Sequence, residues 1–401
     1  MPLPQLTITN LEGACRPTAL QELLLQAALL DGQQAFSAWC EWNRRGGLEQ
    51  LDSGSYHTLP LVYSNLAQQG FQHPLMGTLG GIRRRAWYEN RLLFRRMGPV
   101  IEMLHGAAIP TLLLKGAALA VHYYPDPGLR PMGDLDVLVP EMHALQTLRL
   151  LESQGWKQEG EKNGRKLQLR ESDLGFLHSL TLFHPDGREI DLHWHALYLA
   201  SFPGADQPFW EASVPLEFEG VPTRALCASD QLLHACAHGT MWNPLPPMRW
   251  AADAITVMRS SKTDWQRLLM LAQRLRLITA VRDGLEYLAA ALAAPVPAEA
   301  LADMRQIKVS QSEELEYQRL CKPWHLLGPI DSVRATYDIY ARCMRGEKGL
   351  VKLARLPRYL QCNWGLDRPH RVWPEAMRRI LLRLKIRKRT GWNLDTPKRG
   401  L

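Results

Sequence analysis

The sequence predicts an α/β plus α fold, in which a mixed sheet is flanked by N-terminal and C-terminal helical regions. Between about residues 100 and 198, short apolar runs typical of buried strands alternate with segments of helical spacing. Outside that stretch, apolar residues recur at three- and four-residue intervals, which is typical of amphipathic helices. We therefore divide the chain into an N-terminal helical region (1–99), an α/β core (100–198), a helical domain that closes a cleft (199–295) and a C-terminal helical region with a basic amphipathic end (296–401).

Composition narrows the function classes. The hydrophobic fraction is 46% and the charged fraction 22%, which is ordinary for a folded protein. A formal net charge of +8 favours anionic partners such as nucleotides, nucleic acid or an acidic membrane surface. The seven cysteines form no CxxC pair, which argues against a disulfide framework or a closed zinc site. The sequence shows neither a signal-peptide pattern nor a long apolar run, so we predict a cytoplasmic protein without a transmembrane segment.

The order of elements supports the mixed sheet. Helices are predicted over 18–45, 58–69, 76–106, 116–124, 141–154, 248–260, 263–276 and 278–293, and strands over 111–114, 135–139, 165–170, 177–183 and 188–195. Residues 201–222 are predicted to form a Pro- and Gly-rich loop, and Ser229-Asp230 to cap the helix that follows it. The arginines within 76–106 face either water or a polyanion.

Two carboxylates one residue apart are the strongest chemical signal. Asp134 and Asp136 lie at the strand predicted over 135–139, and alternation along a strand points them to the same side. At a solvated strand edge or in a turn, water would stabilise both carboxylates and no partner would be needed. In a buried strand, two unpaired carboxylates are strongly disfavoured unless a cation lies between them. Bound Mg²⁺ would remove the conflict, with Asp191 of a later strand as a third ligand.

The pattern of Lys-Gly, then Asp-x-Asp, then a later strand Asp resembles the polymerase-β-type nucleotidyltransferase superfamily. The segments LLLKGAALAVHYYPDPGLRPMGDLDVLV and EIDLHWHA are similar to its bacterial branch of mostly uncharacterised nucleotidyltransferases, and the resemblance covers about residues 95 to 275. It implies a polymerase-β-like mixed sheet and an enzyme that moves a nucleoside monophosphate from an NTP to a hydroxyl or phosphate acceptor, with release of pyrophosphate. It also implies that Asp134, Asp136 and Asp191 are catalytic and bind Mg²⁺ or Mn²⁺.

The resemblance implies a phosphate-binding corner at Lys115-Gly116, where the wider superfamily has Gly-Ser or Gly-Gly. Glycine allows a close backbone approach to a phosphate, and lysine adds a point charge for the triphosphate. Arg130 follows on a Pro/Gly loop just ahead of the acidic strand. We predict that it contacts phosphate or an acidic substrate, and the alternative is a surface arginine.

Further polar residues recur at helical spacing. One helix face carries Asp230, His234 and His238, which are four residues apart. Three alternatives exist for this face: it points into the nucleotide cleft, it is an internal hydrogen-bonded face, or its two histidines bind zinc. Arg249 and Asp253, also four apart, form a helix salt bridge or belong to the cleft. We predict His234, His238 and Arg249 as nucleotide contacts.

The sequence does not decide the roles of three residues of the later acidic strand. Glu189 is either a fourth acidic group at the metal or a solvated strand end. One of His193 and His195 assists proton transfer, or both are structural.

The segment 378–389 is a basic amphipathic helix, packed on the domain or meeting nucleic acid or an anionic membrane surface. Two other function classes compete with the enzyme. One is a non-catalytic nucleotide-binding or sensor protein. The other is an RNA-modifying or toxin-type nucleotidyltransferase that holds RNA through this helix. The sequence does not reveal the acceptor, which is a small molecule, a protein or RNA.

Overall fold

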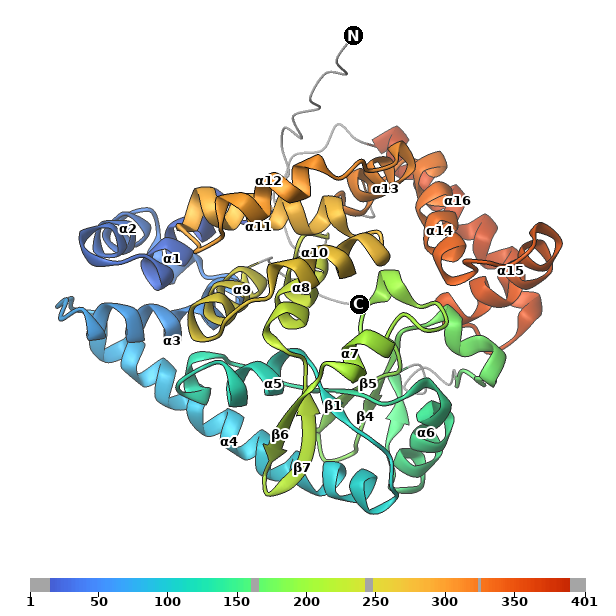
Figure 1. Cartoon of the computed structure of the whole chain (residues 1–401), viewed down its shortest axis with the longest axis horizontal. Coiled ribbons are helices and arrows are strands. Elements are labelled where there is room, and N and C mark those ends of the chain that lie inside the picture. The colour runs from blue at the N-terminus through green and yellow to red at the C-terminus, as the bar shows by residue number, and fades with distance from the viewer. Residues whose placement is uncertain (1–14, 160–165, 242–247, 324–325, 390–401) are drawn as a thin grey trace, which may run out of the picture.

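The computed structural model describes residues 15–159, 166–241, 248–323 and 326–389. Its centre is a seven-stranded sheet with strand order β3-β4-β5-β2-β1-β7-β6 (Figure 1). The strands are β1 (Leu112–Leu113), β2 (Leu135–Leu138), β3 (Lys157–Gln158), β4 (Ser179–Phe183), β5 (Glu189–His193), β6 (Val214–Phe218) and β7 (Val221–Ala225). β2 is parallel to β5 and β1 is parallel to β7, whereas the other neighbours are antiparallel. This mixed sheet with flanking helices confirms the predicted fold class.

Two predicted features of the sheet are wrong. The described part of the strand predicted over 165–170 is not a strand, and the edge of the sheet is β3 instead. The predicted loop over 201–222 contains β6, which forms a hairpin with β7 through Glu219 and Gly220, both at positive φ. The prolines in both strands argued against a hairpin, because proline has no backbone N–H to donate to a neighbouring strand. Since β7 pairs with β1, the sheet continues past the proposed core boundary at residue 198.

One face of the sheet packs on α4 (Met76–Gly106) and α6 (Ala144–Ser153). Leu135 and Val137 of β2 enter that hydrophobic cluster, whereas Leu138 belongs to the cluster on the opposite face. Because side chains alternate along a strand, Asp136 shares the face of Leu138. The acidic side chains therefore point toward the helical layer.

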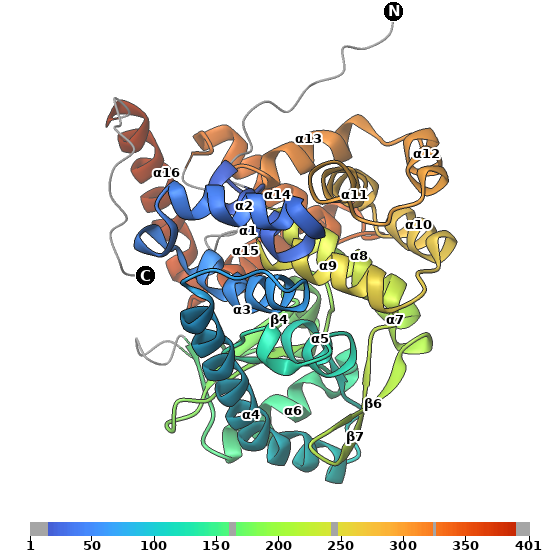
Figure 2. The same ribbon diagram turned by 90° about the vertical axis from the view of Figure 1, so that its left-hand side faces the viewer.

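The helical layer comes from both ends of the chain. Its helices include α1 (Ala19–Leu29), α2 (Gly32–Arg44), α3 (Ser53–Gln68), α8 (Ala228–Gly239), α9 (Arg249–Ser260), α10 (Trp265–Arg274) and α11 (Ile278–Leu292). In Figure 2, α1 to α3 lie above α4, beside α8, α9 and α11. The single helix predicted over 18–45 is thus two helices, α1 and α2. The expected cap at Ser229-Asp230 is wrong, because α8 begins at Ala228 after Cys227.

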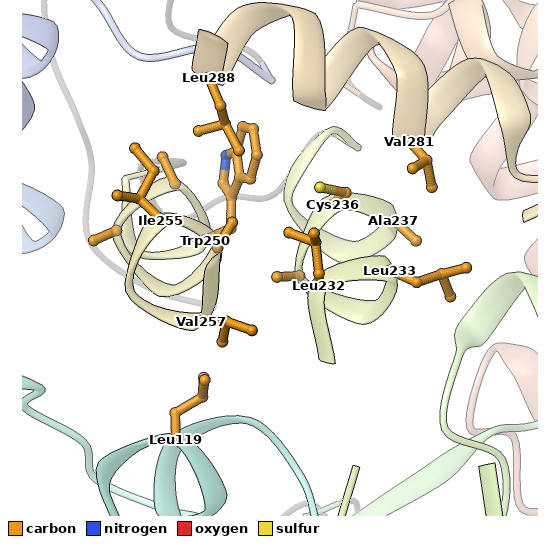
Figure 3. Packing of buried hydrophobic residues seen from close by; sticks show 14 of the residues in the cluster. Leu119, Leu232, Leu233, Cys236, Ala237, Trp250, Ile255, Val257, Val281 and Leu288 are labelled. Carbon is orange, nitrogen blue, oxygen red and sulfur yellow. The ribbon is translucent and has the colours of Figure 1, made fainter. Parts of the chain in front are cut away.

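The core of the layer joins it to the sheet. Figure 3 shows Leu232 and Cys236 of α8 between Trp250 of α9 and Val281 of α11, with Leu119 below them. Leu119 belongs to α5 (Lys115–His122), the helix that follows β1. This continuous apolar contact holds α8 and α9 over the acidic face of the sheet.

The remaining helices complete the C-terminal region and the connections of the chain. They are α7 (Gln207–Glu211), α12 (Ala298–Gln306), α13 (Gln311–Leu320), α14 (Pro329–Cys343), α15 (Gly349–Asn363) and α16 (Val372–Arg389). Within the described ranges, no helix is both long and apolar enough to cross a bilayer. Several α4 arginines form ion pairs with residues in loops next to the sheet, as Arg83 does with Asp126 and Arg91 with Glu219.

Candidate active site

Parallel pairing of β2 with β5 creates the acidic cluster. The register places Asp136 beside Asp191 and Leu138 beside His193. One ligand atom from each of Asp136, Asp191 and His193 lies within 4.8 Å of the other two. The predicted meeting of the two strands is therefore confirmed, and His193 joins their carboxylates.

Asp136 is the most constrained member of this cluster. Its side chain is buried, and its Oδ1 accepts hydrogen bonds from Lys115 Nζ at 2.7 Å and from His193 Nε2 at 3.1 Å. Burial alone would raise the pKa of Asp136, but the Lys115 ammonium and the His193 imidazole outweigh it and hold that pKa far below its usual range. Asp136 is therefore a fixed negative charge beneath the helical layer.

Asp134 and Asp191 have fewer partners. Burial, followed by the negative charges of Asp136 and Asp191, raises the pKa of Asp134. Asp191 accepts a hydrogen bond at Oδ1 from the Thr181 hydroxyl of β4. Among the described residues, nothing donates to either oxygen of Asp134, to Oδ2 of Asp136 or to Oδ2 of Asp191. Three carboxylates thus each retain an oxygen that can accept a cation.

The Lys115-Gly116 corner lies where β1 passes into α5. Lys115 has φ of 42°, a conformation that costs a non-glycine residue about 1–2 kcal/mol. Burial favours the neutral amine, but the Asp136 carboxylate and its neighbours raise the pKa of Lys115. A Cβ at Gly116 would lie 2.9 Å from Nη1 of Arg130 and 3.3 Å from the Met132 sulfur. A side chain at position 116 would therefore collide with the Arg130 side chain, and this contact is the reason for glycine in the structure.

Arg130 is not the surface or phosphate-binding arginine predicted from its loop. It is buried, and its Nε and Nη2 donate to the two carboxylate oxygens of Asp253 at 2.9 Å each. The Tyr124 hydroxyl donates to Asp253 as well. This bidentate pair ties the loop before β2 to α9, so Arg130 positions the acidic strand.

Arg249 differs from Arg130 although both lie near Asp253. Of the two alternatives for Arg249 and Asp253, the helix salt bridge is absent from the described contacts, and Asp253 pairs with Arg130 instead. Arg249 is half-buried, has no hydrogen-bond or ion-pair partner among the described residues, and lines a narrow hollow with His57 and Arg130. Burial and then the Arg130 charge lower the pKa of Arg249. An unpartnered guanidinium beside another cation is suited to an anion.

The helix face with Asp230, His234 and His238 divides into two environments. Asp230 is buried and pairs with Arg267 of α10. His234 is buried against the Ala196 carbonyl oxygen, 3.1 Å from its Nε2, so it is an internal residue and not the predicted nucleotide contact. His238 keeps an exposed surface and lines a pocket beside Lys115. Within the described residues, no metal-ligand cluster forms on this face.

The three residues of undecided role, in β5 and just after it, lie in different surroundings. His193 lies against Asp136, whereas His195 Nδ1 is 2.6 Å from the Asp206 carboxylate, away from the cluster. Asp206 also accepts the Ala196 backbone N–H, so His195 stabilises the chain after β5. Glu189 lies at the start of β5, opposite Phe183 of β4.

Sequence reasoning missed Thr181 and His178. Thr181 reaches Asp191 because β4 pairs antiparallel with β5, and the His178 ring lies 5.3 Å from that of His193. The alternation of β4 hints at the side of Thr181, but no pattern in the chain specifies the register that brings it to Asp191.

The basic segment 378–389 forms the second part of α16. Arg378 and Arg379 pair with Glu375, and Arg379 lies over the Trp364 ring. Trp373 and Met377 are exposed, so the apolar side of the helix is not fully packed on the domain. The side chains of 383–389 lie outside the described part, and the anionic contact stays a prediction.

Comparison with known proteins places the site in a family context. A family model described as "Uncharacterised nucleotidyltransferase" matches residues 55–293, more than half of the chain. A solved structure, "Crystal structure of an antigenic nucleotidyltransferase-like protein from Paracoccidioides brasiliensis", is 16% identical, with a TM-score of 0.34 and coverage of 52% of this chain and 95% of that chain. No curated protein matches the chain.

Proposed function

The chain belongs to the family of uncharacterised nucleotidyltransferases, and from this premise we propose that it transfers a nucleoside monophosphate from an NTP to a hydroxyl or phosphate acceptor. The observation that carries the proposal is the cluster of Asp136, Asp191 and His193 beside Lys115. Asp134 lies outside that 4.8 Å cluster, but its charge is coupled to Asp136, Asp191 and Lys115. Carboxylates gathered in a largely buried site are costly in a fold, and nucleotidyl transfer is a chemistry that uses them.

A divalent metal ion fits this cluster. Each of the three carboxylates keeps an oxygen that accepts no hydrogen bond from the described residues, and such oxygens are the ligands that Mg²⁺ and Mn²⁺ take. We assign Asp134, Asp136 and Asp191 as the residues that would hold Mg²⁺ or Mn²⁺, which would supply positive charge for the triphosphate and activate the acceptor. His193 orients Asp136 through its hydrogen bond.

The chain's own groups have separate roles in the proposal. Asp191, held through one oxygen by Thr181, takes the proton of the acceptor hydroxyl as the acceptor oxygen attacks the α-phosphorus. Lys115 and Arg249 neutralise the triphosphate, whose pyrophosphate departs. Arg249 and His238 come from α9 and α8, so the helices within 199–295 would close the cleft over the nucleotide.

A direct test incubates the full chain with each α-labelled NTP, Mg²⁺ and a cell extract as the acceptor source. Labelled acceptor and pyrophosphate should appear with the wild type and not with an Asp134→Ala/Asp136→Ala double variant. Equal pyrophosphate release by both proteins would refute the enzyme. NTP binding without any release would favour the sensor alternative.

Arg249→Ala should raise the KM for the NTP on the order of 10–100-fold, because a charge-assisted hydrogen bond contributes about 1.5–3 kcal/mol. The free energy of unfolding should change by less than about 1 kcal/mol, since Arg249 has no partner to lose among the described residues. Steady-state kinetics and urea unfolding measure the two effects. Arg259→Ala, an exposed arginine on the same helix, is the matched control and should leave both values unchanged. An unchanged KM in Arg249→Ala would contradict the assignment.

Metal binding is testable without turnover. Mn²⁺ titrated into the protein and followed by electron paramagnetic resonance should bind, and Asp191→Asn should weaken that binding by about tenfold or more, because one ligand charge is lost. Asp186→Asn, at the exposed turn before β5, serves as the control and should bind Mn²⁺ as the wild type does. Chelation should stop pyrophosphate release, and added Mg²⁺ should restore it. Equal Mn²⁺ affinity in Asp191→Asn and wild type would remove Asp191 from the ligand set.

A further inference from the structure

A cavity of about 200 Å³ opens beside the acidic cluster, and Lys115, which is assigned to the triphosphate, lies at its edge. Its polar end is formed by Lys115, His178, His193 and His238. Lys115 and His193 both donate to Asp136 Oδ1, so this end lies one side chain away from the acidic cluster. The cavity is therefore placed to hold a molecule that reacts at that cluster.

The other walls of the cavity are apolar. They come from the chain after β5, from the end of α8 and from the start of α11, and include Leu197, Met241 and Leu277. Among the described residues, no aspartate or glutamate lines the cavity, and the one ammonium that does, that of Lys115, is paired with Asp136. A charged ligand would lose its hydration here without gaining a free counter-charge, which is strongly unfavourable.

His178 and His238 add hydrogen-bonding capacity to the cavity without adding charge. Burial and the Lys115 charge lower the pKa of His238, to about 4, although its ring still faces the open cavity. Burial and the neighbouring His193 lower the pKa of His178 well below its ordinary value. A neutral imidazole both donates and accepts a hydrogen bond, which matches a hydroxyl group.

The cavity and the cationic hollow both border the Lys115-Gly116 corner. Lys115 lines the cavity, whereas Gly116 contacts Arg130, which lines the hollow with Arg249. Lys115 and Arg249 are the cations assigned to the triphosphate, and the described apolar walls of the cavity carry no cation, which leaves that apolar space for the second substrate. Its volume is below the roughly 300–1,000 Å³ of sites for drug-sized ligands, so it takes a group of about one ring.

We propose that this cavity is the acceptor site and that the acceptor is an uncharged alcohol with an apolar flank of about one ring. The inference rests on the proposed function and specifies its second substrate. The hydroxyl oxygen forms a bond to the α-phosphorus of the NTP, the bond from that phosphorus to the bridging oxygen breaks, and pyrophosphate leaves. The hydroxyl proton passes to Asp191 and then to water, so the products are a nucleoside monophosphate ester and pyrophosphate.

Benzyl alcohol is a probe of this size and chemistry, and benzylamine and benzoate are charged molecules of nearly the same shape. Nuclear magnetic resonance of protein labelled at histidine Cε1, with the His238 signal assigned by His238→Gln, reports binding without turnover. Benzyl alcohol should shift the His238 signal saturably, and both charged probes should bind weaker by about tenfold or more. With labelled NTP and Mg²⁺, benzyl alcohol should also yield a labelled benzyl ester.

Matched variants localise the effect. Met241→Trp fills the rim of the cavity and should abolish the alcohol shift while leaving NTP affinity unchanged. Met270→Trp places the same residue at an exposed position of α10 and should behave as the wild type.

Tighter binding of benzylamine or benzoate, no shift with benzyl alcohol, or loss of NTP affinity in Met241→Trp would each overturn the inference. Saturable alcohol binding without ester formation from any NTP would instead count against the proposed function and against the acceptor role, and leave an alcohol-binding cavity.

Discussion

Asp136→Asn should lower the rate of pyrophosphate release by a factor on the order of 10³, the scale seen when a group that stabilises a transition state is removed. The amide keeps the shape of the carboxylate but removes the charge that Lys115 and His193 hold in place. No neighbouring carboxylate can replace it, because Asp134 and Asp191 approach from other backbone positions. Single-turnover measurements with saturating NTP separate this loss from any change in binding.

The control for this prediction is another buried aspartate. Asp173 is buried and pairs with Arg358 of α15, and it is not a member of the acidic cluster. Asp173→Asn should lower the free energy of unfolding and leave the rate within a few-fold of wild type. If Asp136→Asn loses no more activity than Asp173→Asn, Asp136 does not act in the reaction.

Arg130→Ala should destabilise the fold by about 3–5 kcal/mol, because it leaves the Asp253 carboxylate buried without its counter-charge. The Tyr124 hydroxyl would be the only group still donating to that carboxylate among the described residues. Urea unfolding followed by circular dichroism measures the loss.

A double variant shows whether the ion pair is the cause. Arg130→Met/Asp253→Leu replaces both charges by apolar groups and should recover most of the stability, because no unpaired charge then remains buried. Arg249→Ala should not destabilise the fold, since Arg249 has no such partner within the part of the chain that the structure describes. Equal losses in Arg130→Ala and Arg249→Ala would contradict the division between a positioning and a ligand-facing arginine.

The local patterns of the sequence were sufficient for the fold class and for half of the site. Alternation in the predicted strand 135–139 puts Asp134 and Asp136 on one side, and the structure places Asp136 on the face opposite the α4 cluster. The hairpin of β6 and β7 escaped prediction because its prolines are typical of loops. The sequence signal that could have revealed the hairpin is the Glu219-Gly220 turn between VPLEF and VPTRA, two segments in which side chains of alternating positions are buried.

The partners of each charge were decided by the tertiary structure alone. His193 and Asp136 are 57 residues apart, and Arg130 and Asp253 are 123 apart. Periodicity reports which side of its own element a residue faces, over a few neighbours. Which residue it meets there depends on strand register and on helix packing over the sheet, and these are set by the whole hydrophobic core. The sequence by itself therefore determined the acidic strand and its chemistry. Only the fold decided that Arg130 is buried against Asp253 while Arg249 pairs with none of the described residues.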